Sequence, residues 1–332
     1  MGVNFGVGVE KAEILVLAEN TVDVTLIIDE RFRGRVSHAG AMTVGCLGEH
    51  GLSLLVKVKS EDGWHTILMD TCGIKATVLN NMKQLNVDPK SIEKVVISHG
   101  HYDHFGSLIQ VMNELSPGVE VILHPRAFDV KYALRGELTG KSVELGKDEM
   151  ERLVREGKAV KLPPLKRELV EETAKAKGVK IVEDPNPVEL APGVWTSGEI
   201  PIHHPEEVSK GLYTERGDEV VFDDFRDEKS VYIKVKDKGL VVLTGCGHTG
   251  VMNTLENAQS LSGTREVYAI IGGLHMNWAS PQRVNETIKR LREVNPEILS
   301  PLHCSGVKFV AHLLNELPEK TVVAAVGTRF NL

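Results

Sequence analysis

Four side chains that bind transition metals lie within six residues, in His99-Gly100-His101-Tyr102-Asp103-His104. The β-branched run Val95-Val96-Ile97 before them predicts a buried strand, and the amphipathic stretch from Leu108 to Leu115 predicts a helix after them. Imidazole nitrogens with a carboxylate suit zinc best, with iron or manganese as alternatives. We therefore expect a metal site where this strand ends.

The spacing of these residues predicts two sets of ligands. In an extended segment alternate side chains share a face, so His99, His101 and Asp103 are expected to point one way. His104 then faces the other side, where the chain bends into the helix. Two sets suit two adjacent ions. A polar loop with chance histidines is the alternative, and the density of ligands argues against it.

The motif His99-x-His101-x-Asp103-His104 after an apolar strand resembles the signature of the metallo-β-lactamase superfamily. The chain is similar in particular to the dihydropteroate-synthase-like branch, or dihydropterin-ribofuranosylaminobenzene-phosphate synthases. The likeness covers nearly the whole chain and is weakest in the middle. Further matching segments follow in the expected order: Gly51-Leu52-Ser53-Leu54-Leu55-Val56, Ile67-Leu68-Met69-Asp70-Thr71-Cys72-Gly73, Gly245-Cys246-Gly247-His248 and His303-Cys304-Ser305-Gly306.

The resemblance implies which residues bind each ion. One ion would be bound by His99, His101 and His248, and the other by Asp103, His104 and His303. Asp103 would also be catalytic, orienting the nucleophile.

The chain departs from the family at one ligand position. Many superfamily members have a bridging aspartate at the end of the strand that follows the histidine matching His248. Here that strand ends in Gly272-Gly273-Leu274-His275. We expect His275 to be a terminal ligand or to contact substrate, with a structural histidine as the alternative. Without a bridging carboxylate, we expect up to two zinc ions, one of them only partly bound.

Three more residues near the ligands have candidate roles. Asp70 matches a family aspartate that follows a strand, and we expect it to accept a hydrogen bond from a ligand histidine, with a turn-capping aspartate as the alternative. Cys246 and Cys304 flank ligand histidines and could bind metal as thiolates. Because six better ligands exist, we interpret both cysteines as small buried packing residues.

Candidate anion-binding residues lie at two predicted helix starts and in one polar cluster. Helix N-termini favour anions, and Thr249 on one side and Ser305-Gly306 on the other begin helices beside ligand histidines. His203 and His204 stand near where related sequences have an arginine. An exposed turn explains these two histidines slightly better.

The predicted elements place these residues in an α/β protein. Strands alternate with helices through the C-terminal half, and the resemblance implies an αββα sandwich of two mixed sheets. We expect one domain over residues 1–332, in which the charged, helix-rich segment 126–196 is an insertion that forms a cap over the site.

Composition limits the classes of partner. A net charge of −7 argues against nucleic acid, and no apolar run reaches the roughly twenty residues that span a bilayer. Four widely spaced cysteines without a C-x-x-C pattern favour a reducing cytoplasm. A homo-oligomer is compatible with the sequence.

The resemblance implies a reaction, while the motifs leave alternatives open. In this branch a dihydropterin diphosphate condenses with a ribosylated arene, and diphosphate departs. We expect a small phosphorylated or pterin-like substrate. A metal-dependent hydrolase of phosphoesters or lactones is the alternative, and a non-catalytic metal-binding scaffold is the alternative from another class.

Overall fold

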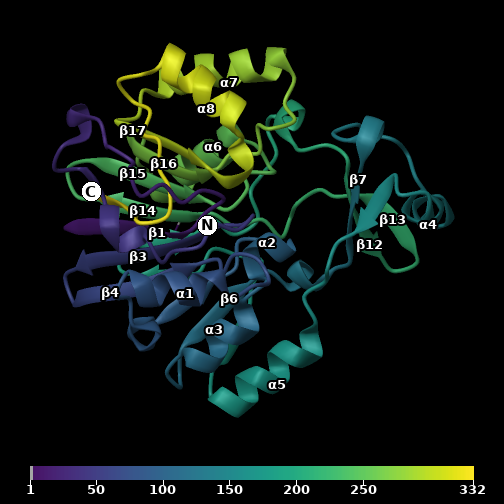
Figure 1. Cartoon of the computed structure of the whole chain (residues 1–332), viewed down its shortest axis with the longest axis horizontal. Coiled ribbons are helices and arrows are strands. Elements are labelled where there is room, and N and C mark those ends of the chain that lie inside the picture. The colour runs from purple at the N-terminus through teal and green to yellow at the C-terminus, as the bar shows by residue number, and fades with distance from the viewer. Residues whose placement is uncertain (1–2) are drawn as a thin grey trace.

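Two mixed β-sheets pack face to face in the computed structural model, which describes residues 3–332, and helices cover their outer faces (Figure 1). This confirms the expected α/β class and the αββα arrangement. The fold matters for function because it brings the ends of parallel strands from both sheets to one edge.

The first sheet has eight strands in the order β2-β18-β1-β3-β4-β5-β6-β9. Pairs from β2 to β4 are antiparallel, whereas β4, β5, β6 and β9 run parallel. Its strands are β1 (Lys11–Ala18), β2 (Val36–His38), β3 (Ser53–Ser60), β4 (Gly63–Met69), β5 (Lys94–Val96), β6 (Glu120–Leu123), β9 (Lys180–Glu183) and β18 (Thr328–Asn331).

The second sheet has six strands in the order β10-β11-β14-β15-β16-β17. Its last three strands are parallel, and each is followed by a segment that carries a predicted ligand. Its strands are β10 (Glu189–Ala191), β11 (Val194–Thr196), β14 (Val231–Val235), β15 (Gly239–Thr244), β16 (Val267–Gly273) and β17 (Ile298–Leu302).

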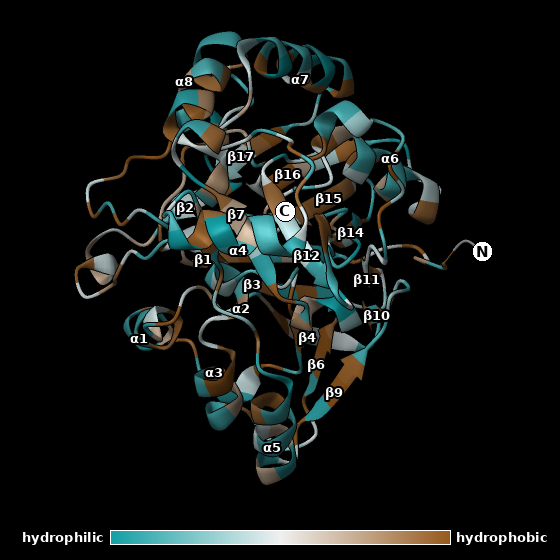
Figure 2. Cartoon of the chain, turned by 90° about the vertical axis from the view of Figure 1, so that its right-hand side faces the viewer, coloured by the Kyte–Doolittle hydropathy of each residue, from teal (hydrophilic) through white to brown (hydrophobic). Residues whose placement is uncertain are grey.

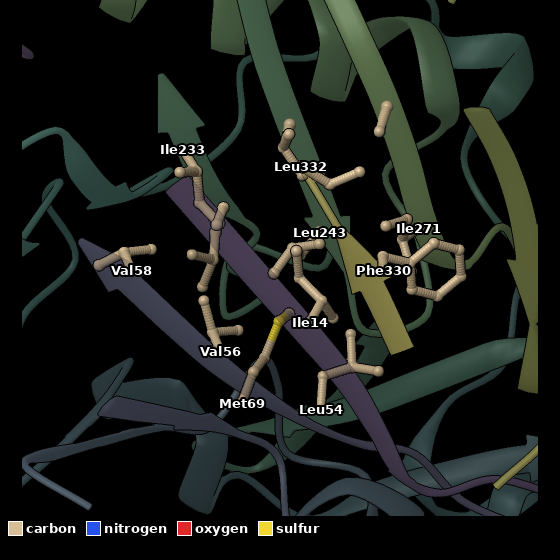
Figure 3. Packing of buried hydrophobic residues seen from close by; sticks show 14 of the residues in the cluster. Ile14, Leu54, Val56, Val58, Met69, Ile233, Leu243, Ile271, Phe330 and Leu332 are labelled. Atoms are coloured by element: carbon tan, nitrogen blue, oxygen red, sulfur yellow. The ribbon is translucent and has the colours of Figure 1, made fainter. Parts of the chain in front are cut away.

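Apolar side chains from both sheets meet between them (Figure 3). Ile14 and Val56 of the first sheet belong to the same buried cluster as Leu243 and Ile271 of the second, and all four are fully buried. Phe330 on β18 joins them close to the chain's end. These strands are rich in Val, Ile and Leu because both faces of the central strands are covered.

Helices on the outer faces match the predicted amphipathic segments closely. Ser280 is the N-cap of α7, and its side chain accepts a hydrogen bond from the N–H of Arg283. Against the first sheet lie α1 (Thr77–Gln84), α3 (Leu108–Glu114) and α5 (Arg167–Lys177), and against the second lie α6 (Val251–Ser262), α7 (Pro281–Val294) and α8 (Val307–Glu316).

Short helical turns occupy several connections. One of them, α2 (Tyr102–Phe105), contains half of the first motif. The 3-10 turns are η1 (Glu30–Phe32), η2 (Gly40–Thr43), η3 (Pro89–Ser91), η4 (Pro125–Phe128), η5 (Gly136–Leu138), η6 (Pro205–Glu207) and η7 (His303–Ser305).

A third sheet, which was not predicted, forms a separate lobe with α4 (Lys147–Arg155) at the right of Figure 1. Viewed from that side, α4 shows a mainly hydrophilic surface (Figure 2), while Met150 and Leu153 face inward and are buried. The order in this antiparallel sheet is β13-β12-β7-β8, with β7 (Lys131–Leu134), β8 (Ala159–Lys161), β12 (Leu212–Arg216) and β13 (Glu219–Phe222).

The segment 126–196 is therefore divided among all three sheets. Its strands β7 and β8 belong to the lobe, β9 extends the first sheet, and β10 and β11 extend the second. The lobe also takes β12 and β13 from beyond residue 196. Within residues 3–332, none of the helices is long and apolar enough to cross a membrane.

Candidate metal centre

The ends of parallel strands from both sheets supply the side chains of the site. Asp70 directly follows β4, and His99 lies three residues beyond β5. From the second sheet, His248, His275 and His303 follow β15, β16 and β17. Residues more than 200 positions apart thus become neighbours because the carboxyl ends of parallel strands share one edge.

Three buried imidazoles, those of His99, His101 and His248, form the first ligand group. Nε2 of His99 lies 3.0 Å from Nδ1 of His101, which lies 3.2 Å from Nε2 of His248. The outer Nδ1 atoms of His99 and His248 contact the hydroxyls of Ser98 and Ser209, at 2.9 and 3.2 Å. Nitrogens bound to one tetrahedral zinc at about 2.05 Å would be about 3.3 Å apart, so this group fits such an ion.

Burial keeps these imidazoles in the form that binds metals. It lowers the pKa of His101 to about 3, and it lowers the pKa of His99 and His248 well below the ordinary value. Neutral imidazole is the ligand form of histidine. The first group is therefore ready to bind a cation at neutral pH.

Asp103, His104 and His303 form the second group, with the sulfur of Cys246 beside them. Oδ2 of Asp103 lies 3.1 Å from Nε2 of His303 and 3.9 Å from Nε2 of His104. The expectation that Asp103 shares a face with His99 and His101 is wrong. Because α2 begins at Tyr102, the alternation of an extended chain stops at His101.

The membership of the two groups is the one that the resemblance implies. That they bind ions, and that Asp103 orients a nucleophile, remain predictions.

Asp70 lies directly behind His104. Its Oδ2 accepts hydrogen bonds from Nδ1 of His104 at 2.6 Å and from the Ser98 hydroxyl at 2.7 Å. Its Oδ1 accepts the Ser98 N–H at 2.7 Å. These contacts leave Nε2 of His104 directed toward the second group. This is the placement that an orienting carboxylate requires.

The charges in the second group balance one another. Burial alone would lower the pKa of His104, but the carboxylates of Asp70 and Asp103 outweigh it and raise that pKa to about 9. Burial would likewise raise the pKa of Asp103, yet the His104 charge and the hydrogen bonds from His303 and His50 hold it well below its ordinary value.

His303 is held by Glu19 and Asn20, two residues that were not among the predicted site residues. Nδ1 of His303 lies 3.1 Å from Oδ1 of Asn20, and the His303 N–H donates to Oε1 of Glu19 at 3.0 Å. Burial raises the pKa of Glu19 to about 7. Both residues directly follow β1. A polar pair at the end of a buried strand was the sequence pattern that could have indicated their role in the site.

An aromatic ring supports His248 from the lobe side. Phe225 stacks on His248 with ring centroids 4.5 Å apart and planes 8° apart. Phe225 is fully buried and has a φ of 50°, which is uncommon for an aromatic residue. Nothing in the local sequence indicated this contact.

A cavity of about 660 Å³ opens over both ligand groups. Ala133 and Leu162, from the predicted cap, line it together with Asp103, so this part of segment 126–196 lies over the site. Apolar residues form much of the rest of the wall: Leu26, Leu212, Trp278, Val307, Val310 and Val323. Among the described residues that line the cavity, none is Lys or Arg.

Known proteins match the chain over both halves of this site. The model of the metallo-beta-lactamase superfamily matches residues 65–222, which contain the first motif. Over 277 residues the chain is 32% identical to the 7,8-dihydropterin-6-methyl-4-(beta-D-ribofuranosyl)-aminobenzene-5'-phosphate synthase of Methanocaldococcus jannaschii, with 82% of this chain and 86% of that protein covered. The chain belongs to the metallo-β-lactamase superfamily.

Other relatives agree with this membership of the superfamily. An uncharacterized protein of the same organism is 27% identical over 272 residues, covering 80% of this chain and 87% of the relative. The solved structure of Tm1679, described as a metal-dependent hydrolase of the beta-lactamase superfamily, is 25% identical, with a TM-score of 0.69 and coverage of 97% and 98%. The metallo-beta-lactamase fold protein YhfI from Bacillus subtilis shares the fold, with a TM-score of 0.50, 12% identity and coverage of 97% and 100%.

Together these relatives support the pterin-linked branch of the superfamily and indicate an enzyme. Superfamily members bind metal ions, and the two groups described above could hold them.

Two of the candidate anion-binding residues lie away from the cavity. His203 is exposed, and Nε2 of His204 pairs with Glu256 at 2.7 Å while its Nδ1 lies 3.2 Å from Arg290. Within residues 3–332, neither histidine lines the cavity. His204 is therefore corrected to a residue of a surface ion-pair cluster, and His203 to an exposed residue outside the cavity.

The start of α6 does attract an anion, but the anion is one of the chain's own carboxylates. Oε2 of buried Glu228 accepts both the N–H and the hydroxyl of Thr249, at 2.7 and 2.8 Å. Both hydrogen-bond donors of Thr249 are therefore used by Glu228. Thr249 is corrected from a candidate substrate-binding residue to a structural one. Because Glu228 lies 21 residues before Thr249, the local sequence could not reveal this hydrogen-bonded pair.

At the other predicted anion site, only one of the two residues reaches the cavity. Ser305 is fully buried, and its hydroxyl accepts the N–H of Leu274 at 3.0 Å. Gly306, with a φ of 79°, lines the cavity at the start of α8. Ser305 is corrected to a packing role, while Gly306 stays a candidate.

His275 lies beside the first group, with its ring centroid 4.2 Å from that of His248. Neither ring nitrogen has a hydrogen-bond partner in the described part of the chain, and both nitrogens are buried. A structural histidine would use at least one of them. The geometry thus favours a ligand or substrate-contacting role over the structural alternative.

Proposed function

We propose that this protein is a metal-dependent enzyme that acts on a small phosphorylated or pterin-like metabolite. In the favoured reaction a dihydropterin diphosphate condenses with a ribosylated arene, and diphosphate is released. The observation that carries the proposal is the convergence of two ligand groups beneath one cavity. Likeness to the synthase of M. jannaschii over 82% of the chain supports the reaction.

The proposed ligands are those of the two groups, with zinc as the favoured ion and iron or manganese as alternatives. Bound ions would supply positive charge that activates water or stabilises a departing diphosphate. His99, His101 and His248 would hold one ion, and Asp103, His104 and His303 the other.

The residues that line the cavity indicate what kind of organic group the substrate could carry beside its anionic group. The apolar wall, which includes Trp278 and Val310, suits a flat or apolar body. Asp103 lines the cavity with its carboxylate 3.4 Å from Nε2 of His50, where it could orient a nucleophile. With no Lys or Arg in the described lining, an anionic group depends on the ions for its binding.

A metal-dependent hydrolase of phosphoesters or lactones is the second candidate. The description of Tm1679 as a metal-dependent hydrolase supports it. Both reactions use the same ligand groups, so the two candidates differ only in the group that accepts the transferred fragment.

The test is to incubate zinc-loaded protein with a dihydropterin diphosphate, with and without the ribosylated arene. Release of diphosphate together with a condensed product of matching mass, only when the arene is present, is the expected result. Release without arene, giving the pterin alcohol, would favour hydrolysis. Turnover of neither this substrate nor bis-p-nitrophenyl phosphate would favour the metal-binding scaffold.

A further inference from the structure

The thiol of Cys246 lies where the ligand groups meet. Its Sγ is 3.1 Å from Nε2 of His104. It lies within 4.8 Å of the ligand atoms of Asp103, His104 and His303. With His248 and His275 it forms a second cluster, of three residues, under the same distance limit. Cys246 thus belongs to two of the three candidate clusters in residues 3–332.

The surrounding backbone holds this sulfur in place. Cys246 is 2% exposed, and it lies in the turn between β15 and His248. A Cβ atom at Gly273 would lie 3.0 Å from Cα of Cys246 and 2.7 Å from Sγ of Cys304. Because that neighbouring strand end has no room for a side chain, Cys246 keeps its position between the groups.

The same geometry argues against a packing role alone. A packing cysteine is expected among apolar side chains, whereas the neighbours of this sulfur include ligand atoms of imidazoles and a carboxylate, together with the thiol of Cys304. The ring nitrogens of His275, in one of its clusters, are buried and unpartnered in the described chain. A set of thiolate and imidazole ligands suits zinc well.

We propose that Cys246 binds metal through Sγ, as a fourth ligand beside Asp103, His104 and His303 that also lies near His248 and His275. With two imidazoles and one carboxylate, its thiolate would make a set of four ligands, the usual coordination number of zinc. This inference replaces the earlier interpretation of Cys246 as a packing residue. It rests on the metal binding of the proposed function and is independent of the reaction.

Cobalt substitution tests the inference without measuring activity. Cobalt-loaded wild-type protein should show a near-ultraviolet thiolate-to-cobalt charge-transfer band, and Cys246→Ser should lose it while keeping visible ligand-field bands. Cys304→Ser is the matched control, because Cys304 also lines the cavity but belongs to none of the candidate clusters. We expect Cys304→Ser to keep the band. Zinc affinity of Cys246→Ser should fall at least by the roughly 10–100-fold seen for lost outer partners.

Alkylation of the wild-type protein gives an answer even if Cys246→Ser does not fold. Bound zinc should slow modification of Cys246 by iodoacetamide, read by peptide mass spectrometry, and should leave Cys46 unaffected. Bound cobalt without a thiolate band, or zinc that does not protect Cys246, would overturn this inference alone. Failure of wild-type protein to bind either metal would overturn the proposed function with it.

Discussion

The ammonium group of Lys131 lies 3.0 Å from the carboxylate of Asp227, and both side chains are buried. Lys131 also lies 2.8 Å from Asp223, and together the two carboxylates raise its pKa despite its burial. Oδ2 of Asp227 accepts the N–H of Gly100, inside the first metal motif, at 2.8 Å. The lobe is therefore tied to the loop of the first motif through one buried cation.

Replacing Lys131 with Met should destabilise the protein by about 3–5 kcal/mol, because two carboxylates are left buried and unpaired. Urea unfolding measures the loss. Lys161→Met on β8 is the control, since its half-exposed ammonium lies 3.7 Å from Glu215 and should contribute at most about 1 kcal/mol. Equal effects of the two substitutions would show that the buried cation has no special role.

Asp70→Asn should weaken zinc binding roughly 10–100-fold while the fold is kept. Asparagine tolerates the left-handed backbone at this position, where φ is 62°, but it cannot stabilise the ring of His104 as a carboxylate does. Chelator competition measures the affinity, with Asp62→Asn at an exposed turn as the control. Unchanged affinity would reduce Asp70 to a turn residue.

Binding of an anion should require metal. The described cavity lining contains Glu19, Asp23 and Asp103 but no Lys or Arg, so the metal-free cavity should repel diphosphate. Calorimetric titration with inorganic diphosphate should detect binding to zinc-loaded protein only. Comparable binding of diphosphate to metal-free protein would contradict the claim that bound metal ions are needed to bind the anion.

Lys229 should make stability depend on pH in a defined direction. Burial lowers its pKa to about 8 from 10.5, so the folded state disfavours the charged form. The cost is complete below pH 8 and disappears as pH rises from 8 to 10.5, where only the unfolded state stays protonated. At about 1.4 kcal/mol per pKa unit, the cost is about 3 kcal/mol.

Lys229→Met should therefore stabilise the protein at pH 7, and its advantage over wild type should shrink by pH 10. Urea unfolding at both values measures the difference, and exposed Lys236→Met should show no such trend. An advantage that grows with pH would have the wrong sign for this explanation.

The sequence predicted best what depends on local pattern. The first motif and the α/β class follow from spacing and periodicity, whereas the membership of the two groups was implied by the resemblance to the family. The face of Asp103 was mispredicted because α2 begins one residue after His101, and the boundary of a single helical turn is not visible in the pattern.

Features that depend on distant partners were not predictable. The lobe pairs β7 with β12, whose strands are separated by about 80 residues, and short strands in charged segments give little periodic signal. The carboxylate of Glu228 accepts the N–H of Thr249 before α6, and Phe225 stacks on His248. Both contacts exist only because the fold brings distant segments together. Cys246 was interpreted as a packing residue because six better ligands were available, and its two clusters become visible only in the folded structure.

The most direct test of the account is the number of metal ions per chain, measured by elemental analysis after loading with zinc and removing excess. Wild-type protein should bind up to two. His248→Ala and His303→Ala should each lose a different one, while His203→Ala, outside the cavity, should match wild type. Retention of both ions by His248→Ala and His303→Ala, or no bound metal in wild type under any loading condition, would contradict the two-ion site.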